Sequence, residues 1–178
     1  MSTLDEKAMT DLWDQHLAAE FQARSPDQAL ATMGPNPSVL HVPLMIGAIG
    51  REQLWEFYAK YFLPQLPPDL ESIPISRTVG QGRIVDEFVS RFTHSNTMDW
   101  LLPGIPPTGK RVEADTVAVV QFEDGKIKHE RLYWDQASLL VQIGLLDRSL
   151  PVVGVEGSQQ VYQPVPRLNE LIHRAHSR

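Results

Sequence analysis

The sequence contains no cysteine, and this absence excludes several kinds of site at once. Disulfide bonds, thiolate nucleophiles and zinc sites built on cysteine are all ruled out. The chain also lacks an apolar run of ~18 residues, the length that a membrane-spanning helix needs. Residues 1–7 are polar and acidic, without the apolar core of a signal peptide. We therefore expect a cytoplasmic protein that makes no use of a membrane.

Positive charge is also in short supply. The chain has 16 Lys and Arg against 22 Asp and Glu, a net charge of −6. Nucleic-acid binding relies on cationic side chains that neutralise phosphates, so a nucleic-acid partner is not expected. The sequence holds no P-loop, no dinucleotide-binding glycine motif, no zinc-protease helix motif and no nucleophile elbow. Nucleotide binding and covalent serine chemistry therefore have no support, and no cofactor is implied.

What is present is the composition of an ordinary globular domain, with 42% apolar and 21% charged residues in a chain of 178. Hydrophobic periodicity, prolines and glycines divide it into segments. Helices are expected at 6–24, 26–33, 51–63, 136–143 and 168–176. Strands are expected at 38–43, 70–79, 84–98, 111–123 and 126–134. This order predicts an α+β fold, a cone-shaped curved antiparallel sheet with N-terminal helices packed on its concave face. Residues 1–146 form the domain, and residues 147–178 form a C-terminal arm.

The dipeptide Asp124-Gly125 is a strong signal for a two-residue hairpin. A regular ladder from this turn pairs Ala118 with Arg131 and Thr116 with Tyr133. One face then carries small residues on the first strand and four functional side chains on the second: His129, Arg131, Tyr133 and Asp135. We expect this face to line a pocket. The opposite face carries Glu130 and four apolar side chains that favour a homodimer: Val117, Val119, Leu132 and Trp134.

On the strand expected at 84–98, the even-numbered residues, which include His94, are expected to face the core. Glu87 is expected to point outwards unless a β-bulge turns it inwards. His94 is either a satisfied core histidine or a proton shuttle. His41, on the short first strand, either lines a pocket or packs in the core. His16 and Glu20 are four residues apart on the first helix, a spacing that can supply two metal ligands. No third ligand is identifiable, so a hydrogen-bonded pair is the preferred interpretation and no metal is expected.

Residues 8–146 resemble the SnoaL-like polyketide cyclase branch of the nuclear transport factor two-like superfamily. The resemblance is carried by the hairpin Asp124-Gly125-Lys126-Ile127, by Asp135, and by the following Leu139-Leu140 and Gln142-Ile143-Gly144. It implies that Asp135 serves as a general acid/base. The alternative role of Asp135 is to cap the helix that follows it, and the two roles can coexist. The sequence departs from the family at His129 and Arg131, where Glu and Trp are common.

These observations lead to two hypotheses. The first is a small-molecule enzyme that performs cyclisation, isomerisation or hydrolysis by cofactor-free acid/base chemistry in an apolar pocket. The second is a non-catalytic module of the same fold that binds a small ligand or dimerises. In the first, the catalytic residues are Asp135 and His94. A small apolar or aromatic ligand contacts His41, Glu87, Trp100, His129, Arg131 and Tyr133.

Overall fold

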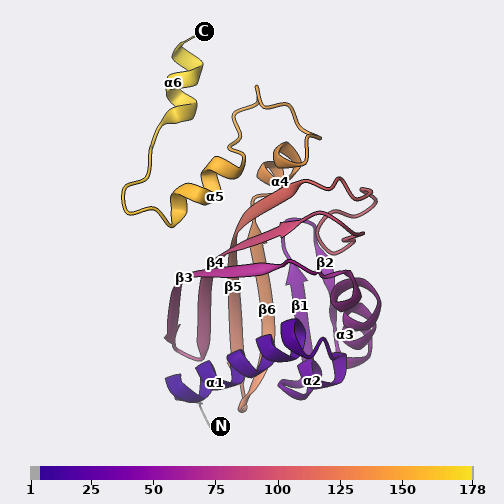
Figure 1. The fold of residues 1–178 in the computed structure, drawn as a ribbon. Coiled ribbons are helices and arrows are strands. Elements are labelled where there is room, and N and C mark those ends of the chain that lie inside the picture. Colours follow the sequence, from indigo (N-terminus) through magenta and orange to yellow (C-terminus); the bar gives the residue numbers. More distant parts are fainter. Residues whose placement is uncertain (1–4, 178) are drawn as a thin grey trace.

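One curved sheet forms the body of the molecule, and the N-terminal helices cover its concave face (Figure 1). The structure is a computed structural model, and it describes residues 5–177. The six strands follow the order β2-β1-β6-β5-β4-β3. Neighbouring strands are antiparallel, except that β1 and β6 are parallel. The expected α+β class and the helix-covered face are thus confirmed.

The elements follow one another as the chain order predicts, with two additions. The helical segments are α1 (Glu6–Leu17), η1 (Ala18–Gln22), α2 (Pro26–Ala31), α3 (Arg51–Phe57), η2 (Tyr58–Phe62), η3 (Leu63–Gln65), α4 (Gln136–Gln142), α5 (Val155–Val161) and α6 (Glu170–His176). The strands are β1 (Met33–His41), β2 (Ile46–Ile49), β3 (Glu71–Gly80), β4 (Arg83–Thr93), β5 (Arg111–Glu123) and β6 (Lys126–Trp134). The sequence did not predict β2 and α5. Within residues 5–177, none of the helices combines the length and apolar character needed to cross a bilayer.

The predicted strand at 84–98 is too long. β4 ends at Thr93, and the chain then enters a loop that reaches β5. Met98, which was expected at the end of this strand, is buried from the loop instead, as is Trp100. Ile84, Asp86 and Phe92 are buried from the strand itself, so the even-numbered face of β4 is directed to the core as expected.

Helices α1 and α2 begin where the sequence offers a capping side chain. Asp5 accepts a hydrogen bond from the amide of Ala8 at 2.7 Å, and Ser25 accepts one from the amide of Gln28 at 3.3 Å. Each oxygen satisfies an amide that has no partner within its helix. Pro26 occupies the first turn of α2, where its missing N–H is not needed. These caps fix where the helical layer starts along the sheet.

Two helices continue into single π-helical turns. In η1 the amide of Ala23 donates to the carbonyl of Ala18 at 2.9 Å, and in η2 the amide of Leu63 donates to the carbonyl of Tyr58. Both bonds span five residues instead of four. π-Helical turns are rare and frequently occur at functional sites. Here η1 carries Glu20, which is buried, and η2 begins with Tyr58, which is also buried.

A β-bulge next to the hairpin turn changes the predicted register. Phe122 lies opposite Ile127 as expected, but Gln121 lies opposite His129, so Lys128 is an extra residue on β6. Beyond the bulge Ala118 lies opposite Leu132, and the predicted pairing of Ala118 with Arg131 is wrong. The alternation of side chains is shifted by one residue along the rest of β6. Its even-numbered residues therefore face the core, and its odd-numbered residues face outwards.

This shift also alters the face that was expected to form a homodimer. Leu132 and Trp134 pack against the core, so only Val117 and Val119 of the predicted apolar set remain on the outer face. Tyr133 lies there too, with 41% of its surface exposed. The homodimer stays a prediction, with a smaller apolar surface to support it.

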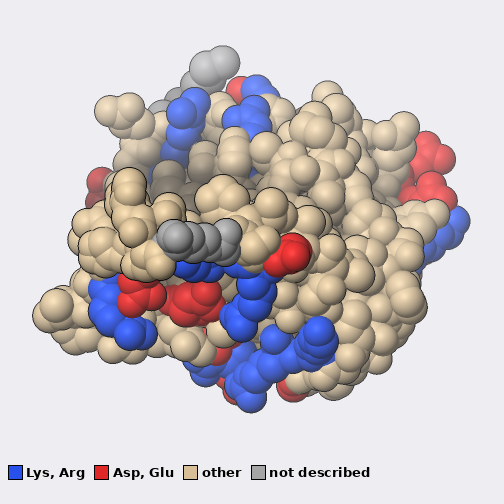
Figure 2. Space-filling view, turned by 90° about the horizontal axis from the view of Figure 1, so that it is seen from above, with Lys and Arg blue, Asp and Glu red and all other residues tan. Residues whose placement is uncertain are grey.

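The C-terminal arm covers part of the outer face through α5. The Ser158 hydroxyl donates to the carbonyl of Glu113 at 3.0 Å, and the Tyr162 hydroxyl donates to the Glu113 carboxylate at 3.3 Å. Arg91 also donates to this carboxylate, at 3.0 Å. Seen from the end that carries the arm, acidic and basic side chains lie close together (Figure 2). The small helix α6 was expected from the sequence, and it stands apart from the sheet (Figure 1).

Candidate functional site

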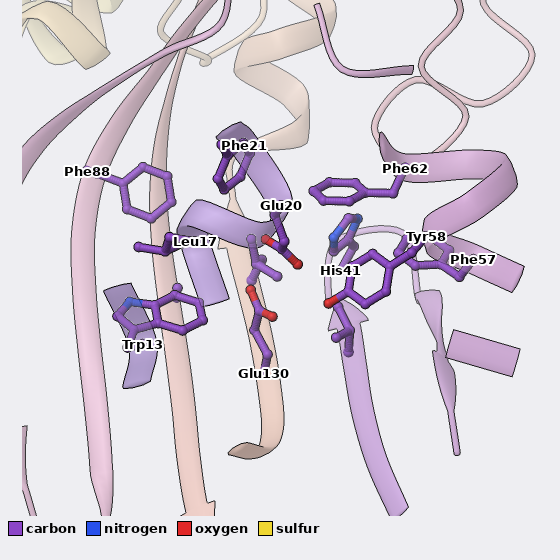
Figure 3. A pocket seen from close by; sticks show the side chains of 13 residues that line it. Trp13, Leu17, Glu20, Phe21, His41, Phe57, Tyr58, Phe62, Phe88 and Glu130 are labelled. Atoms are coloured by element: carbon purple, nitrogen blue, oxygen red, sulfur yellow. The ribbon is translucent and has the colours of Figure 1, made fainter. Parts of the chain in front are cut away.

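A small cavity lies between the helical layer and the sheet (Figure 3). Its volume is about 30 Å³, enough for one or two water molecules. The walls are mostly aromatic and aliphatic, and the polar groups among them come from four separate elements: η1, β1, η2 and β6. The lining residues are Trp13, Leu17, Glu20, Phe21, Val39, His41, Phe57, Tyr58, Phe62, Phe88, Ala118, Glu130 and Leu132.

Two carboxylates that line this cavity, those of Glu20 and Glu130, contact the buried imidazole of His16. Nε2 of His16 lies 3.1 Å from Oε1 of Glu20 and 3.5 Å from Oε2 of Glu130. The three side chains are at most 4% exposed. Glu20 and Glu130 point toward one another in the middle of the site, with Tyr58 beside them (Figure 3). Buried ionisable groups occur in proteins when they are paired, and these three supply one another's partners.

A hydrogen bond to Thr32 fixes the orientation of the His16 ring. The Thr32 hydroxyl donates to the carbonyl of Ala29 at 2.6 Å, and Nδ1 of His16 lies 2.7 Å from that hydroxyl oxygen. Because the hydroxyl proton is used on Ala29, the oxygen accepts the Nδ1–H of His16. This leaves Nε2 directed at the two carboxylates. Trp13 stacks on the other side of the ring, with centroids 5.4 Å apart.

The charges in this group shift its pKa values. Burial alone would lower the pKa of His16, but the charges of Glu20 and Glu130 and their hydrogen bonds outweigh it and raise the pKa to about 10. Burial raises the pKa of Glu130, and the nearby charge of Glu20 adds to that rise. Burial also raises the pKa of the Tyr58 hydroxyl. His16 is therefore an imidazolium at neutral pH, and Glu130 holds a proton more readily than an ordinary glutamate.

His41 presents a neutral imidazole to the same cavity. Its Nδ1 donates to the carbonyl of Trp100 at 3.0 Å. Its ring is surrounded by aromatic rings, among them those of Trp100 and Trp134 at centroid distances of 5.6 and 5.5 Å. Burial lowers the pKa of His41 to about 4, so the ring is uncharged at neutral pH. His41 lines this cavity and is also packed in the core, and its contact with a ligand stays a prediction.

A much larger groove adjoins the cavity. It has a volume of about 650 Å³ and runs between the α1–η1 segment and strands β3 and β4. The groove and the cavity share four lining residues: Trp13, Leu17, Phe21 and Phe88. Phe21 is 43% exposed, and its ring meets that of Phe62 edge to face at 6.2 Å. These shared side chains form the wall between an open groove that can hold a small molecule and the closed cavity that holds the carboxylates.

The structure places the two predicted catalytic residues away from this cavity. Asp135 is exposed at the start of α4, where its carboxylate accepts the amide of Ser138 at 3.0 Å. It therefore caps the helix, which was its alternative role. His94 is buried beyond the end of β4, with Nδ1 3.2 Å from the Thr108 hydroxyl. Burial lowers the pKa of His94. Neither residue lines the cavity or the groove, and a catalytic role for either stays a prediction.

The expected ligand-binding row on β6 does not line the cavity, because the bulge turns it outwards. Arg131 and Tyr133 are exposed on the outer face, and His129 is half-buried with Nδ1 2.8 Å from the Ser38 hydroxyl. Glu87 lines the wide groove and accepts a hydrogen bond from the Ser76 hydroxyl at 2.9 Å. Trp100 lies behind the cavity, packed against His41, and its indole N–H has no hydrogen-bond partner among residues 5–177.

The sequence analysis assigned no catalytic or ligand-binding role to the groups at the centre of the site. Glu20 and His16 were noticed as a pair, but Glu130 was assigned to the outer face. One signal could have corrected this assignment. Leu132 and Trp134 are apolar at alternate positions of β6, whereas Arg131 and Tyr133 are polar or amphipathic. That alternation agrees with an inward Glu130 and conflicts with an unbroken ladder from the turn.

Known proteins support the fold and assign the family. The profile of the family "SnoaL-like polyketide cyclase" matches residues 2–143. The search of curated proteins found no match. Among solved structures, TsrD from Streptomyces laurentii superposes with a TM-score of 0.63 and 19% sequence identity, covering 80% of this chain and 99% of its own. A structure from Jannaschia described as a SnoaL-like polyketide cyclase gives 0.61 and 22%, covering 79% and 92%. TerC, co-crystallised with polyporic acid, gives 0.57 and 17%, covering 76% and 98%. At these identities the similar structures show a shared fold, and the profile match over most of the chain places this protein in the SnoaL-like polyketide cyclase family.

Proposed function

We propose that this protein is a small-molecule enzyme that moves a proton on an apolar or aromatic ligand without a cofactor. The observation that carries the proposal is the pair of buried carboxylates, Glu20 and Glu130, that face one apolar cavity. An apolar cavity with a few convergent polar groups is the usual form of a small-molecule site. Burial raises the pKa of Glu130, which suits this carboxyl group to accept and return a proton.

The ligand lies in the groove, and its reacting end enters the cavity between Leu17, Phe21 and Phe88. The groove has the volume for a ring system, whereas the cavity alone does not. Closure of the aromatic wall behind the reacting end would exclude water and strengthen the electrostatic interactions inside. The groove also offers the ion pair of Arg77 with Asp86, with which polar substituents of the ligand can interact.

Glu130 is the proposed acid/base. Its carboxylate removes a proton from a carbon next to a carbonyl group, and the same proton returns to another atom of the ligand, which isomerises or cyclises it. The Tyr58 hydroxyl lies 3.4 Å from Nε2 of His16, beside both carboxylates, and can donate a hydrogen bond to the oxygen on which negative charge develops. His16, whose Nε2 lies 3.1 Å from Oε1 of Glu20, holds that second carboxylate in place beside Glu130.

The proposal is tested with one ligand and two matched variants. Polyporic acid, with which TerC was co-crystallised, is the first probe, followed by aromatic polyketides of similar size. Binding is followed by tryptophan fluorescence, to which Trp13 contributes from a position that lines both the groove and the cavity. Turnover is followed by mass spectrometry in buffer containing EDTA. Glu130→Gln should bind the probe but lose at least 100-fold in turnover. Glu123→Gln, at the exposed end of the neighbouring strand, should retain turnover.

The second candidate is a non-catalytic module that binds the same class of ligand. It is favoured by the pairing of both carboxylates with His16, which is also what a purely structural ion pair would look like. In that case ligands of the groove would bind and remain unchanged, and Glu130→Gln would affect stability only. If the protein converts a ligand and Glu130→Gln converts it equally fast, the protein is an enzyme but Glu130 is not its acid/base.

The expected homodimer and cytoplasmic location accompany this proposal as predictions. The homodimer is supported by the apolar residues that remain on the outer sheet face, Val117 and Val119.

A further inference from the structure

We propose that His16, Glu20 and Glu130 form a binding site for one divalent transition-metal ion. Imidazole nitrogen and carboxylate oxygen are the ligands that Zn²⁺, Mn²⁺ and Co²⁺ accept in proteins. The first two ligands, His16 and Glu20, are four residues apart in the continuous α1–η1 segment. The third ligand, Glu130, lies far away in the sequence, on strand β6. The β6 bulge brings that third ligand, Glu130, to the other two.

The distances between the three ligand atoms match the coordination shell of a small ion. Nε2 of His16 lies 3.1 Å from Oε1 of Glu20 and 3.5 Å from Oε2 of Glu130, and all three lie within 4.8 Å of one another. A tetrahedral ion with bonds of about 2.1 Å holds its ligand atoms about 3.4 Å apart. An ion placed between the three atoms therefore needs small rotations of the two glutamate side chains and no change in the backbone.

One ligand atom lacks a hydrogen bond. Oε2 of Glu130 is buried, and among the described residues 5–177 it has no hydrogen-bond partner. Its contact with Nε2 of His16, at 3.5 Å, is that of a long ion pair. Buried carboxylate oxygens without a partner are rare because they lose their hydration without compensation. A metal ion between Glu130 and His16 would satisfy it.

The ring of His16 is held as a metal ligand requires. Its Nδ1–H donates to the Thr32 hydroxyl, and this bond leaves Nε2 as the atom that faces the carboxylates. Histidine ligands in metal sites almost always donate their other ring N–H in this way, which fixes both tautomer and orientation. The ligand atom must be unprotonated, so the ion takes the place of the Nε2 proton.

The charge of the site also favours a divalent cation. Two carboxylates and a neutral imidazole carry two negative charges, which one divalent ion neutralises. Glu20 and Glu130 line the cavity, so the remaining coordination positions of the ion face the place where water or a ligand oxygen can bind.

This inference does not depend on the proposed proton-transfer reaction. A bound ion would withdraw both carboxylates from acid/base use, so the two states exclude one another at this site. Metal binding is therefore measured without any organic ligand, and the turnover assay is run in EDTA. If the metal titration fails, the turnover assay still tests the proposed reaction. If the turnover assay fails, the metal titration still tests the metal site.

The test uses the full chain with the tail histidines removed, His173→Ala and His176→Ala, because these exposed residues lie three apart on α6 and could bind metal themselves. Co²⁺ is titrated at pH 8, with its visible absorption as the readout, followed by Zn²⁺ in a calorimeter. We expect one ion per chain and an absorption spectrum of four- or five-coordinate Co²⁺. Absence of stoichiometric binding at 1 mM Co²⁺ would overturn the proposal.

Single variants then assign the ligands. Glu130→Gln and Glu20→Gln should each weaken Co²⁺ binding at least 100-fold, whereas Glu123→Gln should leave it unchanged. Thr32→Val removes the acceptor of the Nδ1–H and should weaken binding about 10- to 100-fold. Circular dichroism establishes whether each variant is folded. If Glu130→Gln does not fold, the Co²⁺ affinity of Glu20→Gln decides the assignment. Unchanged binding in a folded glutamate variant would place the ion elsewhere and overturn the assignment.

Discussion

Glu130 lies opposite Val120 in the β5–β6 pair, and both side chains are directed to the interior of the cone. This pairing exists because Lys128 is an extra residue between Ile127 and His129, both of which keep partners on β5. A single inserted residue therefore decides which side chains of β6 reach the cavity. Strand pairing of this kind can be tested by deleting residues on either side of the bulge.

Deletion of Lys128 should leave the site intact. Without the extra residue, His129 follows Ile127 in an unbroken ladder, and Glu130 still lies opposite Val120. The cost should be in the range of a typical single substitution, about 1–3 kcal/mol in the free energy of unfolding. Deletion of Arg131 should instead turn Leu132 and Trp134 outwards and prevent folding. Circular dichroism shows whether each variant folds, and urea unfolding measures the stability of the Lys128 deletion. An Arg131 deletion that folds with the same stability would contradict the bulge.

A second prediction concerns the charge balance of the buried group. His16→Gln keeps the size of the side chain and removes the cation between Glu20 and Glu130. Two buried carboxylates then face one another, and removal of one partner from a buried ionic group typically costs about 3–5 kcal/mol. Urea unfolding at pH 7 should show a loss of this size.

The control and the rescue for His16→Gln are both available in the chain. His129→Gln changes a half-buried histidine that contacts the Ser38 hydroxyl, and it should cost far less. The double variant His16→Gln, Glu20→Gln removes one of the opposed charges and should recover part of the stability. A double variant that is less stable than the sum of its single changes would mean that the two carboxylates do not repel one another.

The fold followed from the sequence because its signals are local. The caps at Ser25 and Asp135 and the Asp124-Gly125 turn fixed where helices and strands begin. The site did not follow, because its members come from three parts of the chain and one of them depends on the bulge. The turn does not mark Lys128 as an extra residue, and only the alternation of apolar residues further along β6, at Leu132 and Trp134, indicates the shift. The register predicted from the turn was therefore wrong, and Glu130 was placed outside. The pairing of His16 with Glu20 was local and was therefore found.

A third prediction separates the two roles of Asp135. Its carboxylate caps α4 by accepting the amide of Ser138, a bond that an asparagine oxygen can also make. Asp135→Asn should therefore keep the stability of the protein, and Asp135→Ala should lose about 1 kcal/mol. If the chemistry takes place at Glu130, both variants should retain turnover of a ligand that the protein converts. If Asp135→Asn is stable but loses turnover, Asp135 takes part in catalysis.

A fourth prediction follows from the buried neutral ring of His41. The unfolded chain takes up a proton at this residue near its ordinary pKa of 6.5, whereas in the folded protein its pKa is lowered to about 4. Between these values the unfolded state binds more protons, so the stability falls as the pH is lowered. The full effect amounts to about 3 kcal/mol and is complete near pH 4.

The variant His41→Leu isolates this contribution from other titrating groups. It should be less stable than the natural protein at pH 7, because the Trp100 carbonyl loses its donor. The difference between the two proteins should shrink from pH 7 to pH 4, since only the natural protein then loses stability at residue 41. His173→Gln, on the exposed helix α6, should follow the natural protein at every pH. A constant difference between His41→Leu and the natural protein would contradict the lowered pKa.

The last prediction concerns the arm and the outer face of the sheet. A chain that ends at Leu146 keeps all six strands and the cavity, and loses α5 and α6. It should fold, with a loss of about 2 kcal/mol for the two hydrogen bonds that Ser158 and Tyr162 make to Glu113. Because α5 no longer covers the Glu113 end of β5, the truncated chain should also self-associate at lower concentration than the full chain. Urea unfolding and sedimentation velocity measure the two effects. If the truncated chain does not fold, the arm is part of the domain. If it folds and self-associates no more than the full chain, the outer face is not a dimer surface.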